Sequence, residues 1–484
     1  MRQKLLWISS AAAVLALGFG GGYLARGPAE VSEAELLIRS ARVLWGLTLT
    51  TPQLQLMTED LKDNLKAYAA IRRESIPNDL LPALEFHPRG AAPPVPAAAA
   101  PPTGRRFTRP TNIEELAFRP VTELAELVRT RQVTSMELTE MYLARLKRHD
   151  AQLHCVVTLT ETLAREQARR ADAEIAAGRW RGPLHGIPYG AKDLLAVPGY
   201  PTTWGTTPYR DQVLADTATV VRRLEEAGAV LVAKLTLGEL AWGDVWFGGQ
   251  TRNPWNLKEG SSGSSAGSAA ATAAGLVGFA IGTETWGSIV SPCTRCGVTG
   301  LRPTFGRVSR AGAMALSWSM DKIGPIARSA DDCAVILDAI RGPDGLDPTV
   351  TDAPYRIPAR RPLDRLRFGY LKPLFEGDYP ARANNAASLA TLRRLGARLE
   401  PVELPPGPVD ALAFILSAEA AAAFDELTRS GGLDRMARQT RDAWPNVFRS
   451  ARFIPAVEYI QANRLRTRLI ADTNALFERV DVLV

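Results

Sequence analysis

The sequence predicts an α/β fold in which helices cover both faces of a mixed, mostly buried β-sheet, with a helical extension at the N-terminus. Two segments carry this prediction. Residues 216–235 give an amphipathic helix, a glycine and the apolar run "AVLVAKL", and residues 268–284 repeat that order with a helix of small residues. Both runs are predominantly apolar, which is typical of strands buried on both faces.

Composition agrees with a packed globular protein. The 484 residues are 46% hydrophobic and 23% charged, enough for one large domain or for two or three ordinary ones. The net charge of +7 comes from scattered arginines, without a dense basic stripe or interleaved aromatic residues. We therefore expect no nucleic-acid partner.

The N-terminus predicts a signal peptide or a membrane anchor over residues 1–27. Two positive charges in "MRQK" precede about 21 uncharged residues, close to the ~20 that a membrane-spanning helix needs. No clear cleavage site follows, so a retained anchor that contacts the membrane and a removed signal peptide both stay open. A buried soluble helix is the remaining alternative. The charge distribution favours an exported body, either periplasmic or anchored to the membrane.

Two further segments precede the main domain. Leu, Ile and Val at helical spacing over residues 31–75 predict two amphipathic helices joined near "TLTTPQ". Residues 76–107 contain the tract "PRGAAPPVPAAAAPPTGRR", whose prolines predict an extended linker. We expect the main domain to occupy residues 108–484.

The cysteines and histidines argue against a metal centre, and no motif indicates a cofactor. Four cysteines (Cys155, Cys293, Cys296 and Cys333) are too few for a disulfide framework. The "CTRC" motif has no second pair and no nearby histidine, so it is a poor zinc site. Whether Cys293 and Cys296 pair in an oxidising compartment stays open.

The stretch "EGSSGSSAGSAAATAAGL" at residues 259–276 admits several interpretations. A flexible linker would not run directly into an alanine-rich helix, and a phosphate-binding loop would need a lysine that the stretch lacks. Residues 263–267 match G-x-S-x-G, but that motif needs a histidine later in the chain, and the last histidine is His185. The preceding residues 252–261 also suggest a turn instead of a strand. The reverse order, with His185 before the serine, stays open without a supporting motif.

A serine hydrolase without histidine commonly uses a lysine as its base. Lys192 stands among Gly, Pro, Leu and Val in "GIPYGAKDLLAVPG", a setting that could desolvate its ammonium group, although most lysines are solvated surface residues. A helix of some eleven residues from Ser264 rises about 16 Å. A strand of roughly eight residues would return the chain beside it. Ser264 and Ser288 can therefore be neighbours, although each alone could be a helix cap or a turn residue.

With these residues in hand, the sequence resembles the amidase signature family. The similarity is dense from about residue 186 to 337 and weaker over most of residues 108–484. It rests on several blocks in order: "GIPYGAKDLL", "NPWNL", the Ser/Gly stretch, "GTETWGSIVSP", "GVTGLRPTFGRVSR" and "SMDKIGPIARSADDCAVIL". The resemblance implies an amidase-signature fold and an amidase that needs no cofactor and no metal.

The resemblance also implies a Ser–cis-Ser–Lys triad. By motif position, Ser288 is the nucleophile, Ser264 is the bridging serine after a cis peptide bond, and Lys192 is the base. The backbone N–H groups of Thr285, Trp286 and Gly287, with that of Ser288, would form the oxyanion hole. The implied substrate is a small-molecule or peptide amide, and a homodimer stays open.

Three positions depart from the family pattern. Trp286 stands where the family has glycine, so its indole is expected to narrow the acyl pocket. Glu284 replaces the usual aspartate, and Val290 stands where arginine is common, so the support of the nucleophile loop should differ. Family members also continue beyond the strand equivalent to "VDVLV". We therefore expect the sequence to be C-terminally incomplete and poorly stable as it stands.

Two alternative functions stay open. The helices of residues 31–75 faintly resemble the small C subunit of the tRNA-dependent amidotransferase, whose A subunit belongs to the same family. The chain could therefore be a glutamine-fed component of a transamidation complex, although an exported body argues against a role with cytoplasmic tRNA. An inactive binding protein on the same fold is the third interpretation, which the three retained triad positions disfavour.

Overall fold

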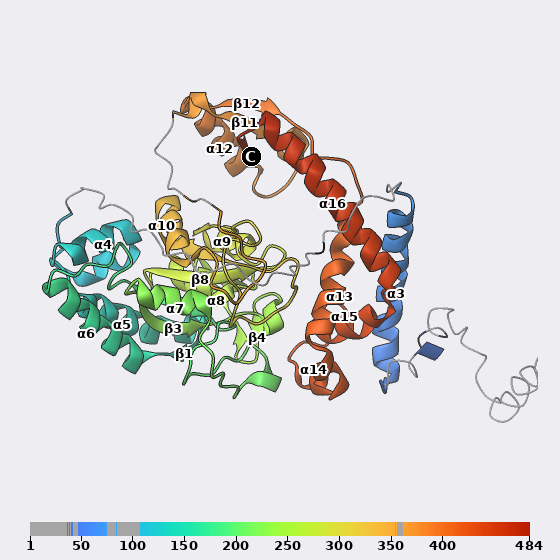
Figure 1. The fold of residues 1–484 in the computed structure, drawn as a ribbon, viewed down its shortest axis with the longest axis horizontal. Coiled ribbons are helices and arrows are strands. Elements are labelled where there is room, and N and C mark those ends of the chain that lie inside the picture. Colours follow the sequence, from blue (N-terminus) through green and yellow to red (C-terminus); the bar gives the residue numbers. More distant parts are fainter. Residues whose placement is uncertain are drawn as a thin grey trace, which may run out of the picture.

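The computed structural model describes residues 47–74, 107–353 and 362–484, together with the single positions 36, 38, 40, 41, 84 and 355. Its largest element is a six-stranded mixed sheet with the order β1-β3-β2-β8-β10-β9 (Figure 1). The three central strands β3, β2 and β8 are parallel to one another, β1 and β10 flank them antiparallel, and β9 pairs antiparallel with β10 at the edge. The strands are β1 (Val156–Leu159), β2 (Pro188–Lys192), β3 (Val230–Leu235), β8 (Phe279–Glu284), β9 (Thr299–Gly300) and β10 (Lys322–Ala327).

Helices cover both faces of this sheet, as the sequence predicts. Alternate residues of β8 show the arrangement, because Phe279 and Ile281 belong to one apolar cluster whereas Ala280 belongs to another. The first cluster includes side chains of α4, α7 and α10, the second includes those of α8 and α9, and α5 and α6 contribute to both. These helices are α4 (Val121–Arg129), α5 (Ser135–Leu153), α6 (Glu161–Ala176), α7 (Thr219–Glu226), α8 (Ala266–Ala273), α9 (Val290–Cys296) and α10 (Ala330–Ile340).

The small side chains of α8 let this helix lie close to the sheet. A Cβ atom on Gly267 would come within 2.4 Å of the Cys155 carbonyl oxygen and 2.5 Å of the Thr236 nitrogen. Helix α8 has eight residues and strand β8 has six, both fewer than the sequence predicted. The end of β8 nevertheless lies beside the start of α8. The serines at the start of α8 and after β8 therefore meet at one edge of the sheet.

One local prediction is wrong. Residues 252–261 form a hairpin of β6 (Arg252–Asn253) and β7 (Asn256–Gly260), not a turn alone. Only Pro254 and Trp255 separate the paired residues Asn253 and Asn256. The predicted turn is therefore present, and it connects the two strands of a hairpin. A second short hairpin consists of β4 (Val245–Trp246) and β5 (Gly249–Gln250).

The C-terminal part adds a parallel three-stranded sheet and a group of helices (Figure 1). The terminal apolar run forms β13 at an edge of this sheet, paired with β11. A long helix, α16, runs from the helical group to the small sheet. These elements are β11 (Arg367–Tyr370), α11 (Lys372–Glu376), α12 (Arg382–Arg394), β12 (Arg398–Pro401), α13 (Phe414–Ala423), α14 (Asp425–Arg429), α15 (Trp444–Ser450), α16 (Ala456–Arg479) and β13 (Val482–Leu483).

The predicted N-terminal extension packs against these C-terminal helices. Its helix α3 (Thr51–Arg72) contacts α13, α15 and α16. Tyr68 lies edge-on to Phe414 with ring centroids 5.2 Å apart, and Arg72 pairs with Glu458 at 2.6 Å. Positions 36, 38, 40 and 41 are also helical, in agreement with an earlier helix in the extension.

We expect Tyr68→Ala to lower the free energy of unfolding by about 3 kcal/mol, because the ring is 2% exposed and its removal leaves a cavity between α3 and α13. Urea unfolding followed by circular dichroism measures this change. Lys66→Ala, on the exposed side of the same helix, should change the free energy by less than about 0.5 kcal/mol. Equal effects of the two substitutions would show that α3 does not pack as described.

Several sequence predictions concern segments that the structure leaves undescribed. The predicted signal peptide or anchor at residues 1–27 and almost all of the 76–107 linker lie outside the described residues. Within the described ranges, no helix has the length and apolar character needed to cross a membrane. All four cysteines are buried free thiols, and no cluster of potential metal ligands occurs in the described part of the chain.

Candidate active site

Lys192 is the last residue of β2, and its side chain is completely buried. Its ammonium group donates to the Ser264 hydroxyl at 2.8 Å, the Ser265 hydroxyl at 3.1 Å and the Thr283 hydroxyl at 2.8 Å. A fourth contact reaches the Thr283 carbonyl at 3.4 Å. All of these partners are neutral, and no carboxylate of the described residues contacts this lysine.

This setting brings Lys192 close to the protonation state that a base requires. Burial lowers the pKa of Lys192 to about 7, while the more distant charges of Asp321 and Glu284 act to raise it. A lysine with this pKa is substantially neutral near pH 7, so it can accept a proton from a bound hydroxyl group.

Ser264 follows a cis peptide bond from Gly263 and lies just before α8. Its hydroxyl group is buried and bonded to Lys192, which is the position that the resemblance assigns to a bridging serine. The neighbouring Ser265 has a different environment. Its hydroxyl donates to the Thr283 carbonyl at 3.0 Å and accepts from the Thr283 N–H at 3.1 Å, so it ties the start of α8 to β8.

Ser288 lies in the loop between β8 and α9, next to this pair of serines. Its carbonyl oxygen accepts a hydrogen bond from the Ser265 N–H at 3.1 Å. Its side chain borders a surface cavity of about 620 Å³, which Gly263 and Trp286 also line. Among the described residues nothing hydrogen-bonds to the Ser288 hydroxyl. Ser288 is thus the member of the predicted triad that borders this solvent-accessible cavity.

The loop before Ser288 offers backbone N–H groups for an oxyanion. Within the described structure, the N–H groups of Thr285, Trp286, Gly287 and Ser288 have no acceptor. Gly287 has a φ of +87°, a left-handed conformation that glycine adopts readily. The predicted oxyanion residues therefore form one run with unpaired donors directly before α9.

Asp321, directly before β10, and Lys322, its first residue, hold this loop through hydrogen bonds. The Thr285 hydroxyl donates to the Asp321 carboxylate at 2.5 Å, and the Lys322 ammonium donates to the Thr285 carbonyl at 3.2 Å. Asp321 also accepts the N–H groups of Leu316 and Ser317 at 2.8 and 2.9 Å. The roles of Thr283, Asp321 and Lys322 were not predicted from the sequence, because they depend on β8 lying beside both β2 and β10.

Glu284 and Val290, two of the positions that differ from the family pattern, are linked by a hydrogen bond beside the nucleophile loop. The buried Glu284 carboxylate accepts the N–H groups of Ile289 and Val290 at 2.8 and 3.0 Å and pairs with Arg302 at 3.0 Å. Burial raises the pKa of Glu284, but these hydrogen bonds and the Arg302 charge outweigh burial and hold its pKa below the usual value. Arg302 thus supplies a cation on this side of the loop, where position 290 carries valine.

The alternative base, His185, lies in a different environment. It contacts Glu174 at 3.2 Å and accepts a hydrogen bond from the Arg181 N–H at 3.1 Å. Burial lowers its pKa to about 4. The structure brings Lys192, Ser264 and Ser288 together and leaves His185 out of the group.

We expect Asp321→Asn to move the acidic limb of the kcat/KM profile to lower pH. The Asp321 charge raises the pKa of Lys192, so its removal lets the lysine lose its proton at lower pH and act as a base there. Glu284 is the other charged group that acts on Lys192, and it stays in place. Asp347→Asn is the matched control, because Asp347 pairs with Arg310 at 2.9 Å and is not among the groups acting on Lys192. An identical shift in both variants would contradict the assignment.

Comparison with known proteins identifies the family to which this arrangement belongs. A family model described as Amidase matches residues 137–484. The chain belongs to the amidase signature family. The match extends well beyond the dense blocks at residues 186–337, and it confirms both the predicted family and the predicted fold.

Curated relatives of this amidase-family chain include amidotransferase subunits and a putative amidase. The A subunit of Glutamyl-tRNA(Gln) amidotransferase from Moorella thermoacetica is 36% identical over 400 residues, which is 76% of this chain and 82% of that protein. A putative amidase, AmiD, of Mycobacterium bovis is 46% identical over 235 residues, or 48% of this chain and 50% of that protein. Family membership therefore supports an amidase-type enzyme without choosing between hydrolysis and transamidation.

A solved structure gives the same fold. The native peptide amidase of Stenotrophomonas maltophilia matches this amidase-family chain with a TM-score of 0.64 and 33% identity, covering 72% of this chain and 79% of that one.

Proposed function

We propose that the protein is an amidase that hydrolyses a carboxamide C–N bond through an acyl-enzyme on Ser288. The observation that carries the proposal is the buried Lys192, which donates to Ser264 at 2.8 Å and has a pKa of about 7. A neutral lysine can act as a base. Ser264, which is hydrogen-bonded to Lys192, would relay the proton. It is adjacent to Ser265, whose N–H donates to the Ser288 carbonyl.

The proposed steps balance with water as the second substrate. Lys192 takes the Ser264 proton while Ser264 takes the Ser288 proton, and the Ser288 oxygen forms a bond to the amide carbon. The N–H groups of Thr285 to Ser288 stabilise the oxyanion. The proton returns through Ser264 to the nitrogen, the C–N bond breaks and the amine leaves. Water then attacks the ester, which releases the carboxylic acid and restores Ser288.

Rapid quenching of a reaction with a simple amide tests the proposal. Intact-protein mass spectrometry should show a mass increase equal to the acyl group, located on the peptide that contains Ser288. Amine and carboxylic acid should form in equal amounts. Turnover without any acyl adduct, or an adduct on another residue, would refute the acyl-enzyme.

A second candidate is a glutamine-fed subunit of a tRNA-dependent amidotransferase. What favours it is the name of several relatives, together with an N-terminal helix α3 that is docked on the C-terminal helices. Glutamine and simple amides, offered to the isolated chain, separate the two candidates. A preference for glutamine would favour transamidation. Failure of a fluorophosphonate to react with the chain would instead favour the third candidate, an inactive binding protein.

We also propose that the body of the protein is exported, on the strength of the basic residues and the long apolar run within residues 1–27. Expressed in bacteria, the full chain should reach the membrane or the periplasm, and deletion of residues 1–27 should leave it in the cytoplasm. Cell fractionation with immunodetection measures this. Full-length protein found wholly in the cytosol would contradict export and favour transamidation.

A further inference from the structure

A large cavity begins beside the oxyanion loop and extends beneath α16. Its volume is about 1030 Å³, enough for a group of many heavy atoms. Thr283 of β8 and Thr285, which directly follows β8, line one end of it, and Tyr459 and Ile470 of α16 line its outer wall. Ser288 does not line it; the nucleophile borders the separate cavity of about 620 Å³.

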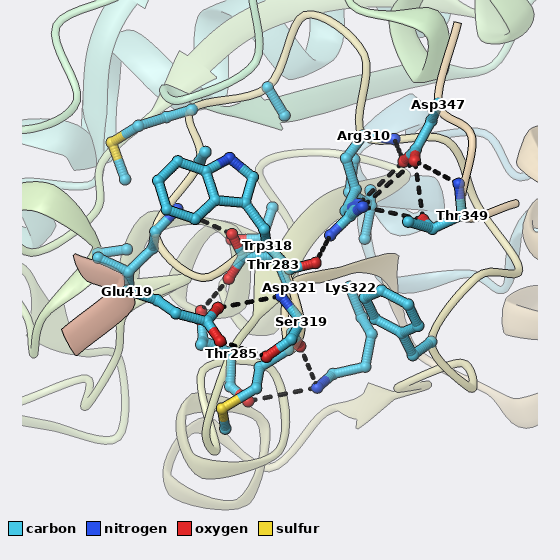
Figure 2. Close-up of a pocket in the computed structure, with 18 of the residues that line it drawn as sticks. Thr283, Thr285, Arg310, Trp318, Ser319, Asp321, Lys322, Asp347, Thr349 and Glu419 are labelled. Atoms are coloured by element: carbon cyan, nitrogen blue, oxygen red, sulfur yellow. Dashed lines mark hydrogen bonds and ion pairs between the residues drawn. The ribbon is translucent and has the colours of Figure 1, made fainter. Parts of the chain in front are cut away.

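The charged groups on the wall of the large cavity already have partners (Figure 2). Arg310 pairs with Asp347 at 2.9 Å and donates to the Thr349 hydroxyl at 2.8 Å. The Glu419 carboxylate accepts hydrogen bonds from the hydroxyl groups of Ser317, Ser319 and Tyr459, at 2.6, 2.6 and 2.8 Å. A charged substrate group would have to compete with these contacts, which makes its burial here costly.

The other cations on the wall are also engaged. Lys322 donates to the carbonyls of Thr285 and Met320, and burial lowers its pKa to about 8. Arg466 donates to the Ser319 hydroxyl at 3.0 Å. The remaining wall is largely apolar and aromatic, with Leu194, Phe305, Met314, Leu316, Trp318 and Ile323 among its residues. An uncharged apolar group fits this wall best.

The smaller cavity differs in character. Trp242 and Trp286 line it together with Asp244, Arg295 and Arg438, and it lies on the side of Gly263 and Ser288. Trp286 is 49% exposed and belongs to this cavity, not to the large one. Ala241 lines both cavities, so they approach each other beside the nucleophile loop.

The proposed reaction decides which half of the substrate enters which cavity. A carbonyl carbon bonded to Ser288 carries three further groups: the oxyanion, the leaving nitrogen and the acyl substituent. The oxyanion faces the N–H groups of the loop, and the nitrogen must face Ser264, which returns the proton. Gly263, the residue directly before Ser264, lines the smaller cavity together with Ser288, so the amine leaves through this cavity. The large cavity is then the space that remains for the acyl substituent.

We propose that the substrate is the amide of a bulky, uncharged, apolar carboxylic acid, with its acyl group in the large cavity and a small or polar amine in the cavity of Trp286. This inference rests on the proposed amidase function. It also places the Trp286 indole against the amine, whereas the sequence predicted that the indole would narrow the acyl pocket.

Four amides that share ammonia as the leaving group test the acyl class: acetamide, hexanamide, succinamic acid and glutamine. Each buried methylene is worth about fourfold in kcat/KM, so hexanamide should exceed acetamide by on the order of 100-fold. The charged succinamic acid and glutamine should be poor substrates. Preference for either of them, or equal rates for acetamide and hexanamide, would overturn the inference.

Two variants separate the cavities. Ala315→Phe places a ring in the large cavity, so the hexanamide-to-acetamide ratio of kcat/KM should fall at least about tenfold. Trp286→Gly should leave that ratio unchanged and should alter the ratio between the anilide and the primary amide of hexanoic acid. The opposite pattern would assign the acyl group to the smaller cavity and overturn the inference.

The control reaction is fluorophosphonate labelling of Ser288 in the wild type. If Ser288 is labelled and the amides are turned over, but kcat/KM does not depend on the acyl group, the substrate class is refuted and the amidase function still holds. An unlabelled Ser288 without turnover of any of these amides would refute the function itself, and the inference with it.

Discussion

We expect Ser288→Ala to lower kcat by about 10⁴-fold or more, and to abolish labelling by a fluorophosphonate, because the substitution removes the oxygen that forms the acyl bond. The fold should survive, since the hydroxyl group has no hydrogen-bond partner among the described residues and the backbone contact with Ser265 does not involve it. Steady-state rates on a primary amide and in-gel detection of a fluorescent probe measure the two effects.

Ser291→Ala is the matched control for this substitution. Ser291 lies three residues further on, at the exposed start of α9, where its hydroxyl shares a hydrogen bond with Ser262 at 2.7 Å. Its alanine variant should be labelled and should turn over amides at nearly the wild-type rate. Retained labelling of Ser288→Ala on Ser265 would show that a different serine is the nucleophile.

Lys192→Met should have the second-largest effect, a loss of several orders of magnitude in kcat with little loss of stability. Methionine fills a similar volume but cannot accept a proton from Ser264. In the wild type, activity should rise with pH through the Lys192 pKa of about 7, because only the deprotonated amine acts as a base. The residual activity of Lys192→Met should not show this rise with pH. A near-normal rate would remove lysine from the mechanism.

Stability measurements distinguish Lys192 from the other buried lysine of the sheet. Lys234 forms a completely buried ion pair with Asp193 at 2.7 Å. Lys234→Met leaves the Asp193 charge without its counter-ion and should lower the free energy of unfolding by about 3–5 kcal/mol. Lys192 has only neutral partners, so Lys192→Met should cost much less. Urea unfolding of the two variants at pH 7 makes the comparison, and equal destabilisation would contradict the neutral environment of Lys192.

The pH dependence of stability has a definite sign for Lys192. Its pKa is about 7 in the folded protein and about 10.5 when exposed, so between these values unfolding takes up a proton. Stability conferred by this site therefore rises with pH across that window. In Lys192→Met, the free energy of unfolding should lack this rise with pH.

The local pattern of the chain was sufficient to predict the core of the fold. In residues 216–235 and 268–284, a helix, a glycine and an apolar run follow one another, and the structure has α7–β3 and α8–β8 there. Apolar runs of this kind exclude water on both faces wherever they lie, so their burial can be read without knowing their neighbours. The meeting of Ser264 and Ser288 followed from the lengths of one helix and one strand.

Tertiary structure alone decided the features that depend on distant segments. Helix α3 packs on helices nearly 400 residues further along the chain, through contacts such as Arg72 with Glu458, and no local pattern specifies such a partner. The small parallel sheet also needs its strands brought together from residues 367–370, 398–401 and 482–483.

For the candidate active site too, the sequence predicted some features and only the tertiary structure determined the others. The sequence alone singled out Lys192, Ser264 and Ser288 as candidates, and their predicted roles came from the resemblance to the amidase signature family, whose motifs are local properties of the chain. The sequence did not identify the charges that set the pKa of Lys192, nor the contact of Asp321 with Thr285. A pKa depends on burial and on charges from every element packed around the group, and these come together only when β2, β8 and β10 lie side by side.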